Sequence, residues 1–487
     1  MGIVTRRDFL RSLAGGTAAA LATRLPVALG ADNPRRPDVL FLAIEDVSAM
    51  RFGCYGNKVC RTPNIDRLAG RAVRFDLAHC TAPPCNPSRT ALLTCRRPET
   101  TKVFGNRDDW RKMHPGILTM PAHLRKHGYE TVRIGKIFHG KFEHDASWSR
   151  VVRERAGLPP ARRRRRALKG PGVELARKQQ EALRRWRQAG KKGRPPRSGV
   201  PFLYGPSGLT DEEEADGGAA TNAIRVLRDK HDKPLFLALG FHKPHLAFTA
   251  PDKYFQMYPP EKIELPKNPP NDLDDMPRPP GQRDQKSFTP KMWREAIAAH
   301  YACLTFVDAQ VGRVLEALAK SGRADSTIVV LWSDHGFLLG EHFAWRKGAL
   351  FDEGLIVALI FHVPGLTRPG VCKRPVDSID IFPTLFDLCG VPMPKGIQGI
   401  SMKPLLADPS RPWRKGAISS SGSRGRSIRT ERFRYSEYGG ADQAELYDHK
   451  TDPGEFTNVV KGPKHADTVA ELSRLLRADW KATLPDS

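Results

Sequence analysis

Five short runs with the character of strands recur along the chain, and amphipathic stretches separate them. The first run, Val39 to Ile44, is apolar at every position, which is typical of a strand buried on both faces of a parallel sheet. The other runs are at 130–134, 235–239, 327–332 and 356–361. Helical periodicity precedes three of them, at 119–127, 219–228 and 292–320. This alternation predicts an α/β fold with a large, mostly parallel or mixed sheet sandwiched by helices.

The pattern weakens beyond about residue 363. Residues 377–389 predict one more helix, and 399–409 predict a loop-rich connector. Short alternating stretches follow, at 426–429, 433–435 and 445–448. Alternation of this kind predicts the strands of a small antiparallel sheet, which a helix over 466–480 would close. We therefore expect a smaller C-terminal α+β subdomain over 411–487.

Two segments interrupt the main domain, which we place at 36–410. Residues 262–290 are rich in Pro and Asp and predict a long surface loop. Residues 151–200 hold 17 Lys or Arg against three Glu, so this basic insertion carries +14 of the net charge of +26. Such charge is typical either of a binding surface for a polyanion, for example a sulfated glycan, or of a solvated, partly disordered segment. A nucleic-acid partner is not expected, because no recognition helix or interleaved aromatic pattern accompanies the charge.

The first 30 residues have the character of an export signal. Adjacent arginines at 6–7 precede a short Ala- and Gly-rich apolar stretch at 13–22, which is typical of a twin-arginine signal. Arg24 and Pro26 interrupt the apolar part, which is too short to span a membrane. We therefore exclude residues 1–30 from the fold. We expect a periplasmic or secreted protein that depends on the twin-arginine (Tat) translocase and is not an integral membrane protein.

The eight cysteines are too few and too unevenly spread for a disulfide scaffold, and no pair has the Cys-x-x-Cys spacing of a zinc or redox site. The sequence leaves open a single bridge between Cys372 and Cys389. With 487 residues, 40% of them hydrophobic, the chain can bury a large core without such bridges.

Charged and imidazole side chains stand directly after four of the predicted strands. In chain order they are Glu45 and Asp46, Lys136 and His139, His242, and Asp334 and His335. Ligands of open α/β sheets bind beyond the carboxyl ends of the strands, so we expect these groups to converge on one rim. Glu45, Asp46 and Asp334 offer hard oxygen ligands. With His335 as a further donor, this set fits a divalent cation, with calcium favoured over magnesium.

The segment Cys85-Asn-Pro-Ser-Arg89 adds a candidate nucleophile to this rim. It directly precedes a helix-like run at 90–94, and a helix N-terminus favours anions through its free N–H groups and its dipole. Arg89 adds a forked cation suited to sulfate or phosphate. Hydrolysis of an ester of either anion requires further cations and proton carriers. The candidates for these roles are Lys136, His139, His242 and Lys347. The alternative interpretation is that Cys85 is a small buried hydrophobic residue.

The Cys-x-Pro-Ser-Arg pattern at 85–89 resembles the hallmark of the formylglycine-dependent, type I sulfatase family, within the alkaline-phosphatase-like superfamily. Further segments resemble the iduronate 2-sulfatase branch of this family, at 53–56, 62–68, 96–98, 127–129, 135–139, 241–245, 333–336, 339–342 and 445–448. The resemblance runs from about residue 36 to about residue 460, broken mainly by the basic insertion. It implies hydrolysis of sulfate monoesters on sulfated polysaccharide or glycosaminoglycan-type sugars, with 2-O-sulfated uronate as one candidate.

The resemblance also implies a role for each group of the rim. Cys85 would be oxidised to formylglycine by a formylglycine-generating enzyme or an anaerobic maturase, and would also ligate the metal. Its hydrated aldehyde would attack sulfur, while the metal and Arg89 hold the attacking oxygen, and a covalent sulfo-enzyme intermediate would form. The remaining roles would be proton donation to the leaving alcohol by His242, expulsion of sulfate through the base His139, and binding of sulfate oxygens by Lys136 and Lys347.

Two positions depart from the family pattern. Residue 45 is Glu where the family usually has Asp, which lengthens one metal ligand by a methylene. Residue 95 is Cys where the recognition sequence for formylglycine formation usually ends in Leu-x-Thr-Gly, so conversion of Cys85 stays open. Two alternatives therefore remain. One is a phosphate or phosphonate monoester hydrolase with the same modified cysteine, and the other is a non-catalytic polyanion-binding protein with an unconverted thiol.

Overall fold

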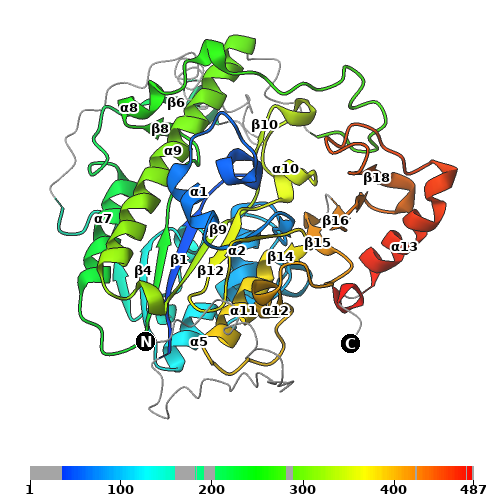
Figure 1. The fold of residues 1–487 in the computed structure, drawn as a ribbon. Helices are drawn as coiled ribbons and strands as arrows, with labels where there is room; N and C mark the ends of the chain where they lie inside the picture. The colour runs from blue at the N-terminus through cyan, green and yellow to red at the C-terminus, as the bar shows by residue number, and fades with distance from the viewer. Residues whose placement is uncertain are drawn as a thin grey trace, which may run out of the picture. The chain divides into compact units, whose positions relative to one another are not determined.

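A computed structural model describes residues 36–158, 181, 184–190, 203–280, 289–422, 425–478 and 480–484 (Figure 1). The predicted export signal and most of the basic insertion lie outside the described residues. Within the described part of the chain, no helix combines the length and the apolar character needed to cross a membrane.

An eight-stranded mixed sheet forms the centre, with strand order β13-β2-β12-β9-β1-β7-β4-β5. Its strands are β1 (Asp38–Ile44), β2 (Val73–Phe75), β4 (Glu130–Gly135), β5 (Arg150–Val152), β7 (Leu235–Gly240), β9 (Thr327–Ser333), β12 (Leu359–His362) and β13 (Gly370–Cys372). Within the part β9-β1-β7-β4-β5, adjacent strands are parallel to each other. β12 runs antiparallel to both β9 and β2. The expected mostly parallel or mixed sheet is confirmed.

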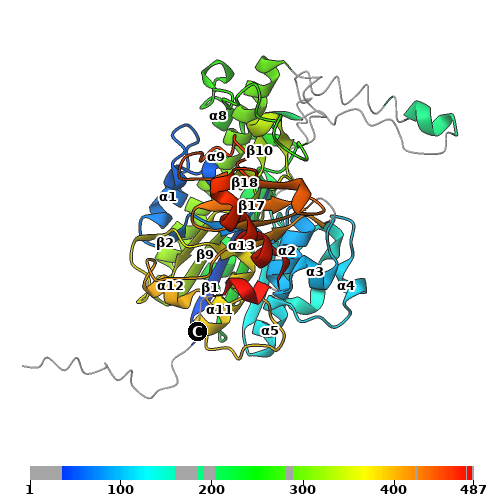
Figure 2. The ribbon, with the colours of Figure 1, turned by 90° about the vertical axis from the view of Figure 1, so that its right-hand side faces the viewer.

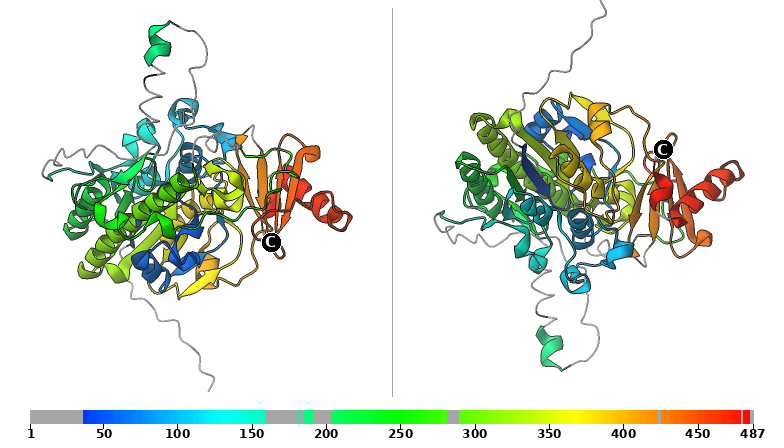
Figure 3. Two further views of the ribbon diagram at one scale, coloured as in Figure 1. Left: turned by 90° about the horizontal axis from the view of Figure 1, so that it is seen from above. Right: turned by 90° about the horizontal axis from the view of Figure 1, so that it is seen from below.

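Helices cover both faces of the sheet (Figure 3). Leu40, Leu42 and Ile44 of β1 face one layer, and the alternate residues Phe41 and Ala43 face the other. The first layer contains α1 (Pro63–Ala69), α7 (Ala215–Arg228) and α9 (Pro290–Lys320). The second contains α2 (Cys85–Thr94), α5 (Met120–Lys126) and α11 (Ile381–Leu388). Because both faces of β1 are buried, its sequence is apolar throughout, as is typical of parallel strands.

A separate four-stranded antiparallel sheet lies near the C-terminus (Figure 2). It is formed by β15 (Ala417–Ser420), β16 (Arg426–Arg429), β17 (Phe433–Glu437) and β18 (Ala444–Asp448). The helix α13 (Ala466–Arg477) packs on it through Leu472, Leu475 and Leu476. This small sheet lies within the predicted subdomain, whose boundary at residue 411 stays a prediction.

Shorter elements complete the described part of the chain. The strands are β3 (Ala78–His79), β6 (Tyr204–Pro206), β8 (Phe248–Ala250), β10 (Leu338–Leu339), β11 (Trp345–Arg346) and β14 (Val376–Asp377). The helices are α3 (Pro98–Thr101), α4 (Trp110–Met113), α8 (Asp252–Phe255), α10 (Asp352–Leu355) and α12 (Lys403–Ala407).

The structure differs from the sequence predictions at several points. The predicted connector at 399–409 contains the helix α12, and β15 was not predicted. The helix α2 begins at Cys85 itself, five residues before the helix-like run. All eight cysteines are free, so Cys372 and Cys389 form no bridge. Within the predicted surface loop at 262–290, residues 263–280 contain no helix or strand, whereas Lys262 ends a 3-10 helix and Pro290 begins α9.

Candidate active site

The predicted rim forms at the carboxyl ends of four adjacent strands, β9, β1, β7 and β4. Two glycines let the ends of β4 and β7 approach each other. A Cβ on Gly135 would lie 2.0 Å from the carbonyl oxygen of Gly240, and a Cβ on Gly240 would lie 1.8 Å from the carbonyl oxygen of Lys136. Any side chain at these positions would clash with backbone, so glycine is required where these two strands enter the site.

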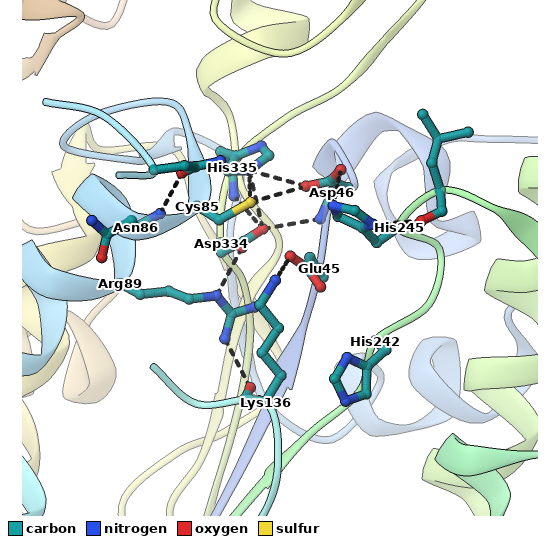
Figure 4. Close-up of polar contacts among 12 residues, drawn as sticks. Glu45, Asp46, Cys85, Asn86, Arg89, Lys136, His242, His245, Asp334 and His335 are labelled. Carbon is teal, nitrogen blue, oxygen red and sulfur yellow. Dashed lines mark hydrogen bonds and ion pairs between the residues drawn. The ribbon is translucent and has the colours of Figure 1, made fainter. Parts of the chain in front are cut away.

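Cys85 is the first residue of α2 and is fully buried. Its Sγ lies 3.2 Å from Nε2 of His335 and 3.4 Å from Oδ1 of Asp46 (Figure 4). The same Sγ lies 2.9 Å from Nζ of Lys347. Burial and the carboxylates of Asp46 and Asp334 raise the pKa of the Cys85 thiol well above its usual value. The unmodified thiol is therefore a poor nucleophile at neutral pH.

Asp334 and Arg89 form a fully buried ion pair behind the cysteine, with 2.9 Å between Oδ2 and Nε. Oδ1 of Asp334 accepts the backbone N–H groups of Asp46 and His335, each at 3.0 Å. Burial alone would raise the pKa of Asp334, but the charges of His335 and Arg89 outweigh burial and lower this pKa to about 2. Arg89 also donates to the carbonyl oxygen of Lys136 at 2.8 Å. The pair therefore ties α2 to the ends of β9, β1 and β4.

Asp46 is held in a strained backbone conformation, with a φ of 50° in the left-handed region. Its carboxylate accepts from Nζ of Lys347 at 2.7 and 2.9 Å, and its Oδ1 lies 3.1 Å from Nε2 of His335. Burial favours the protonated acid, but the positive charges of Lys347 and His335 outweigh it and hold the pKa of Asp46 well below its usual value. Asp46 therefore stays ionised.

Glu45 points to the other side of the β1 end, where it forms a buried ion pair with Lys136. A cavity of about 570 Å³ opens beside this pair, and His139 and His242 are part of its wall. Burial, together with the charges of Lys136 and Arg89, lowers the pKa of His139 to about 3. The imidazole of His139 is therefore neutral, and its buried Nδ1 has no hydrogen-bond partner among the described residues.

The donor set on the floor of the site fits a hard divalent cation. Within the described residues, one ligand atom from each of Asp46, Cys85, Asp334 and His335 lies within 4.8 Å of all the others, and Glu45 belongs to an adjoining group with Asp46. Carboxylate oxygens are the ligands that calcium and magnesium prefer. Each of the three carboxylates is paired with a lysine or an arginine. A bound cation would balance the negative charge of these carboxylates in place of the lysine and arginine side chains.

The structure brings the predicted site residues together in two groups. Those around the sulfur are Asp46, Cys85, Arg89, Asp334, His335 and Lys347. Those lining the cavity are Glu45, Lys136, His139 and His242. Ligand atoms of Glu45 and His139 also lie within 4.8 Å of the sulfur of Cys85. Figure 4 shows His242 on the cavity side of the site, apart from the contacts around the sulfur. The catalytic and metal-binding roles of these residues stay predictions.

Two residues of the site had no predicted role. His245 places Nε2 3.8 Å from Oδ2 of Asp46. It lies in the 241–245 segment, where only His242 was assigned. Glu154 places Oε1 3.3 Å from Nε2 of His242. It lies at the start of the basic insertion, and the composition of that segment gives no signal for a site residue.

Known proteins are similar to this chain in sequence. The Sulfatase family model matches residues 37–391, and the model of the N-sulphoglucosamine sulphohydrolase C-terminal region matches residues 340–481. A sulfatase from Formosa agariphila is 32% identical over 466 residues, which cover 92% of this chain and 88% of the relative. Iduronate 2-sulfatase from Homo sapiens is 30% identical over 418 residues, which cover 78% of this chain and 70% of the relative.

Solved structures share the fold. A 2-O GAG sulfatase superposes with a TM-score of 0.68 at 24% identity and covers 93% of this chain, with 95% of that chain matched. A phosphonate monoester hydrolase from Silicibacter pomeroyi superposes with a TM-score of 0.71 at 23% identity, and the match covers 90% of this chain and 94% of that one. Since the sulfatase model spans most of the sequence, from β1 to the end of α11, the chain belongs to the sulfatase family and is a sulfuric ester hydrolase.

Proposed function

We propose that the chain hydrolyses sulfate monoesters on sulfated sugars, with formylglycine derived from Cys85 as its nucleophile. The observation that carries the proposal is the position of residue 85, which starts α2 and lies within 3.4 Å of Lys347, His335 and Asp46. Relatives named iduronate 2-sulfatase in Homo sapiens and Delta 4,5-hexuronate-2-O-sulfatase in Bacteroides thetaiotaomicron support a sugar substrate. Among sugars, 2-O-sulfated uronate is our specific candidate.

Two groups would complete the site. Formylglycine supplies a hydrated aldehyde, which is an oxygen nucleophile, and a divalent cation, calcium in our proposal, supplies Lewis acidity beside it. Asp46, Asp334, His335 and Glu45 would hold the cation together with residue 85. Arg89 keeps Asp334 ionised and oriented for this role through their buried ion pair.

Lys136 and Lys347 flank the site, and each is paired with a carboxylate of the cation-binding group. With a cation on those carboxylates, both ammonium groups can bind the non-bridging oxygens of sulfate and stabilise their charge. His242, in the wall of the cavity, would donate a proton to the departing alcohol. The neutral ring of His139 would accept a proton when sulfate is released.

Paired aryl esters test the proposal. Purified protein, produced together with an active formylglycine-generating enzyme, is assayed on 4-nitrophenyl sulfate and 4-nitrophenyl phosphate. We expect a higher kcat/KM for the sulfate. A higher value for the phosphate would establish the phosphate or phosphonate monoester hydrolase instead. A third outcome is that the protein hydrolyses neither ester and binds heparin only when residues 151–200 are present. That outcome would establish a polyanion-binding protein.

Removal of the divalent cation is expected to abolish hydrolysis and to lower the melting temperature. A cation present at about 100 times its Kd stabilises the folded state by about 2.7 kcal/mol. The measurement is thermal unfolding and turnover of 4-nitrophenyl sulfate after dialysis against EDTA, followed by addition of calcium or magnesium. Recovery at a lower concentration of calcium than of magnesium supports calcium. If chelation changes neither the turnover rate nor the melting temperature, the proposed cation site is rejected.

Cys95→Gly is expected to increase the fraction of residue 85 that is converted, with little change in stability. Cys95 is the C-cap that follows α2. Its φ of 49° is a left-handed conformation that costs most residues about 1 kcal/mol and that glycine adopts freely. Loss of its buried Sγ, which lies 3.6 Å from the carbonyl oxygen of Ile379, offsets this gain. Peptide mass spectrometry and urea unfolding measure the two effects. Cys303→Ala, at a buried cysteine of α9, is the control. An unchanged converted fraction in Cys95→Gly would show that residue 95 does not limit modification.

We also propose that the protein is exported through the signal at residues 1–30 and acts in the periplasm or outside the cell. The Tat translocase and a formylglycine-generating enzyme or anaerobic maturase would then be its partners. The twin-arginine route carries folded proteins, which suits an enzyme that is modified before export. Cell fractionation of the native host tests this, and accumulation of active enzyme in the cytoplasm alone would reject it.

A further inference from the structure

Glu154 provides a carboxylate partner for the imidazole of His242. Oε1 of Glu154 lies 3.3 Å from Nε2 of His242, with the two side chains 33% and 45% exposed. Both side chains line the cavity of about 570 Å³ beside the reacting centre. Within the described part of the chain, the polar contact that the structure shows for this imidazole is the one with Glu154. A carboxylate in this position can orient the ring and favour its protonated form.

The helix α7 holds both partners in place. Asp216 in its first turn accepts the backbone N–H groups of His242 and Lys243 at 2.9 and 2.8 Å. Two turns later, Nδ2 of Asn222 donates to the carbonyl oxygen of Glu154 at 2.9 Å. Gly218 lies between them, and a Cβ there would come within 2.8 Å of the same carbonyl oxygen. The helix α7 therefore fixes the backbone positions of both Glu154 and His242, and the contact between them follows from the fold.

We infer that Glu154 is a positioning residue for the proton transfer that releases the leaving alcohol. The inference rests on the proposed function, in which His242 is the proton donor. As the bond between sulfur and the leaving oxygen breaks, its electron pair stays on that oxygen. Sulfur becomes bonded to the oxygen of the nucleophile, whose hydroxyl proton passes to solvent. The leaving oxygen takes the proton of a protonated His242 ring, and the neutral ring regains a proton from water. Glu154 itself neither gains nor loses a proton.

The electrostatics of the cavity support this assignment. The hydrogen bond to His242 lowers the pKa of Glu154, so the carboxylate is charged at neutral pH. The other charged or titratable groups of the cavity wall are Glu45, Arg133, Lys136, His139, Glu143, Lys243 and His245. Glu45 is paired with Lys136, and Glu143 lies 3.1 Å from Arg133. The ammonium group of Lys243 donates to a carbonyl oxygen and to a threonine hydroxyl. Glu154 is thus the carboxylate of this wall that contacts His242.

Glu154→Gln tests the inference on two sulfate esters that differ in their need for an acid. 4-Nitrophenyl sulfate releases a stable phenolate, whereas a sugar sulfate releases an alkoxide that must be protonated. We expect kcat/KM to fall about tenfold on the sugar sulfate and less than about twofold on the aryl sulfate. Glutamine removes the charge that favours the protonated ring, and a general acid loses activity as pH rises. The alkaline limb of the pH profile should therefore move to lower pH.

Three variants complete the test. Glu154→Asp keeps the charge and should retain the pH profile. Glu154→Gln in a His242→Gln background should cause no further loss, because the residues act as a unit. Glu130→Gln is the matched control, because it removes the carboxylate of another histidine pair, with Oε2 of Glu130 2.6 Å from Nδ1 of His231 at the opposite end of β4. It should leave both esters and the pH profile unchanged.

Equal losses on the two esters with an unmoved alkaline limb would overturn the inference, because a purely structural role gives that result. If the wild-type enzyme hydrolyses both esters and Glu154→Gln changes neither rate, the inference is overturned. The proposed function is then unaffected. A wild-type protein that hydrolyses neither ester would reject the proposed function and the inference with it.

Discussion

Replacement of Cys85 by alanine is expected to eliminate sulfate ester hydrolysis and to leave the fold intact. Loss of a covalent nucleophile typically lowers kcat by roughly 10⁴- to 10⁶-fold, because the rest of the site stabilises a reaction that can no longer start. The side chain is small, so its removal from a buried position costs on the order of 1 kcal/mol of unfolding free energy. Turnover of 4-nitrophenyl sulfate and urea unfolding measure the two effects.

Cys372→Ala is the matched control for this substitution. Cys372 is also a fully buried cysteine, but it lies in β13 at the far edge of the central sheet. The control should show the same small loss of stability and full activity. Retention of more than a tenth of the wild-type activity by Cys85→Ala would contradict the assignment of residue 85 as the nucleophile.

Asp334→Asn is expected to cause the largest loss of stability among changes at the site, together with loss of activity. Its carboxylate balances the buried guanidinium of Arg89 and accepts two backbone N–H groups on its other oxygen. Removal of one partner of a buried ion pair typically costs about 3–5 kcal/mol, because the remaining charge is left uncompensated. An amide also offers one acceptor oxygen where two are used. Urea unfolding of protein freed of divalent cations measures the loss separately from any effect on metal binding.

The comparison for Asp334→Asn is a surface ion pair of similar geometry. Glu316 and Lys320 lie one turn apart on α9, with 2.5 Å between Oε1 and Nζ and with both side chains mostly exposed. Glu316→Gln should leave the unfolding free energy unchanged within error, because water and salt screen such pairs. A loss below about 1 kcal/mol in Asp334→Asn, similar to that of an exposed pair, would show that the buried pair does not organise the site.

The fold was predictable where burial imposes a simple pattern. The strands β1, β4, β7 and β9 begin and end within one residue of their predicted bounds. For β1, β7 and β9 the reason is that both faces are covered and the apolar runs are continuous. The strands β2, β5 and β13 have three residues each. A stretch this short shows no periodicity, and its pairing depends on neighbours distant in the sequence. The helix α12 was missed for a similar reason, because five residues show little more than one turn.

The sequence predicts those parts of the site whose positions follow from the order and direction of the strands. Polar residues directly after parallel strands must meet at one edge, and this rule predicts that Glu45, Asp46 and Asp334 lie together, as the structure has them. The left-handed backbone of Asp46 has no signature in the sequence. Glu154 could not be found either, because its contact with His242 depends on how α7 docks two segments that are 88 positions apart.

The chemical state of residue 85 in protein from the native host tests the account most directly. The peptide that contains this residue is analysed by mass spectrometry after reaction with a hydrazide, which labels aldehydes, and with iodoacetamide, which labels thiols. We predict labelling of residue 85 by the hydrazide and not by iodoacetamide, in a preparation that hydrolyses sulfate esters. A free thiol at residue 85 in active enzyme would contradict the account.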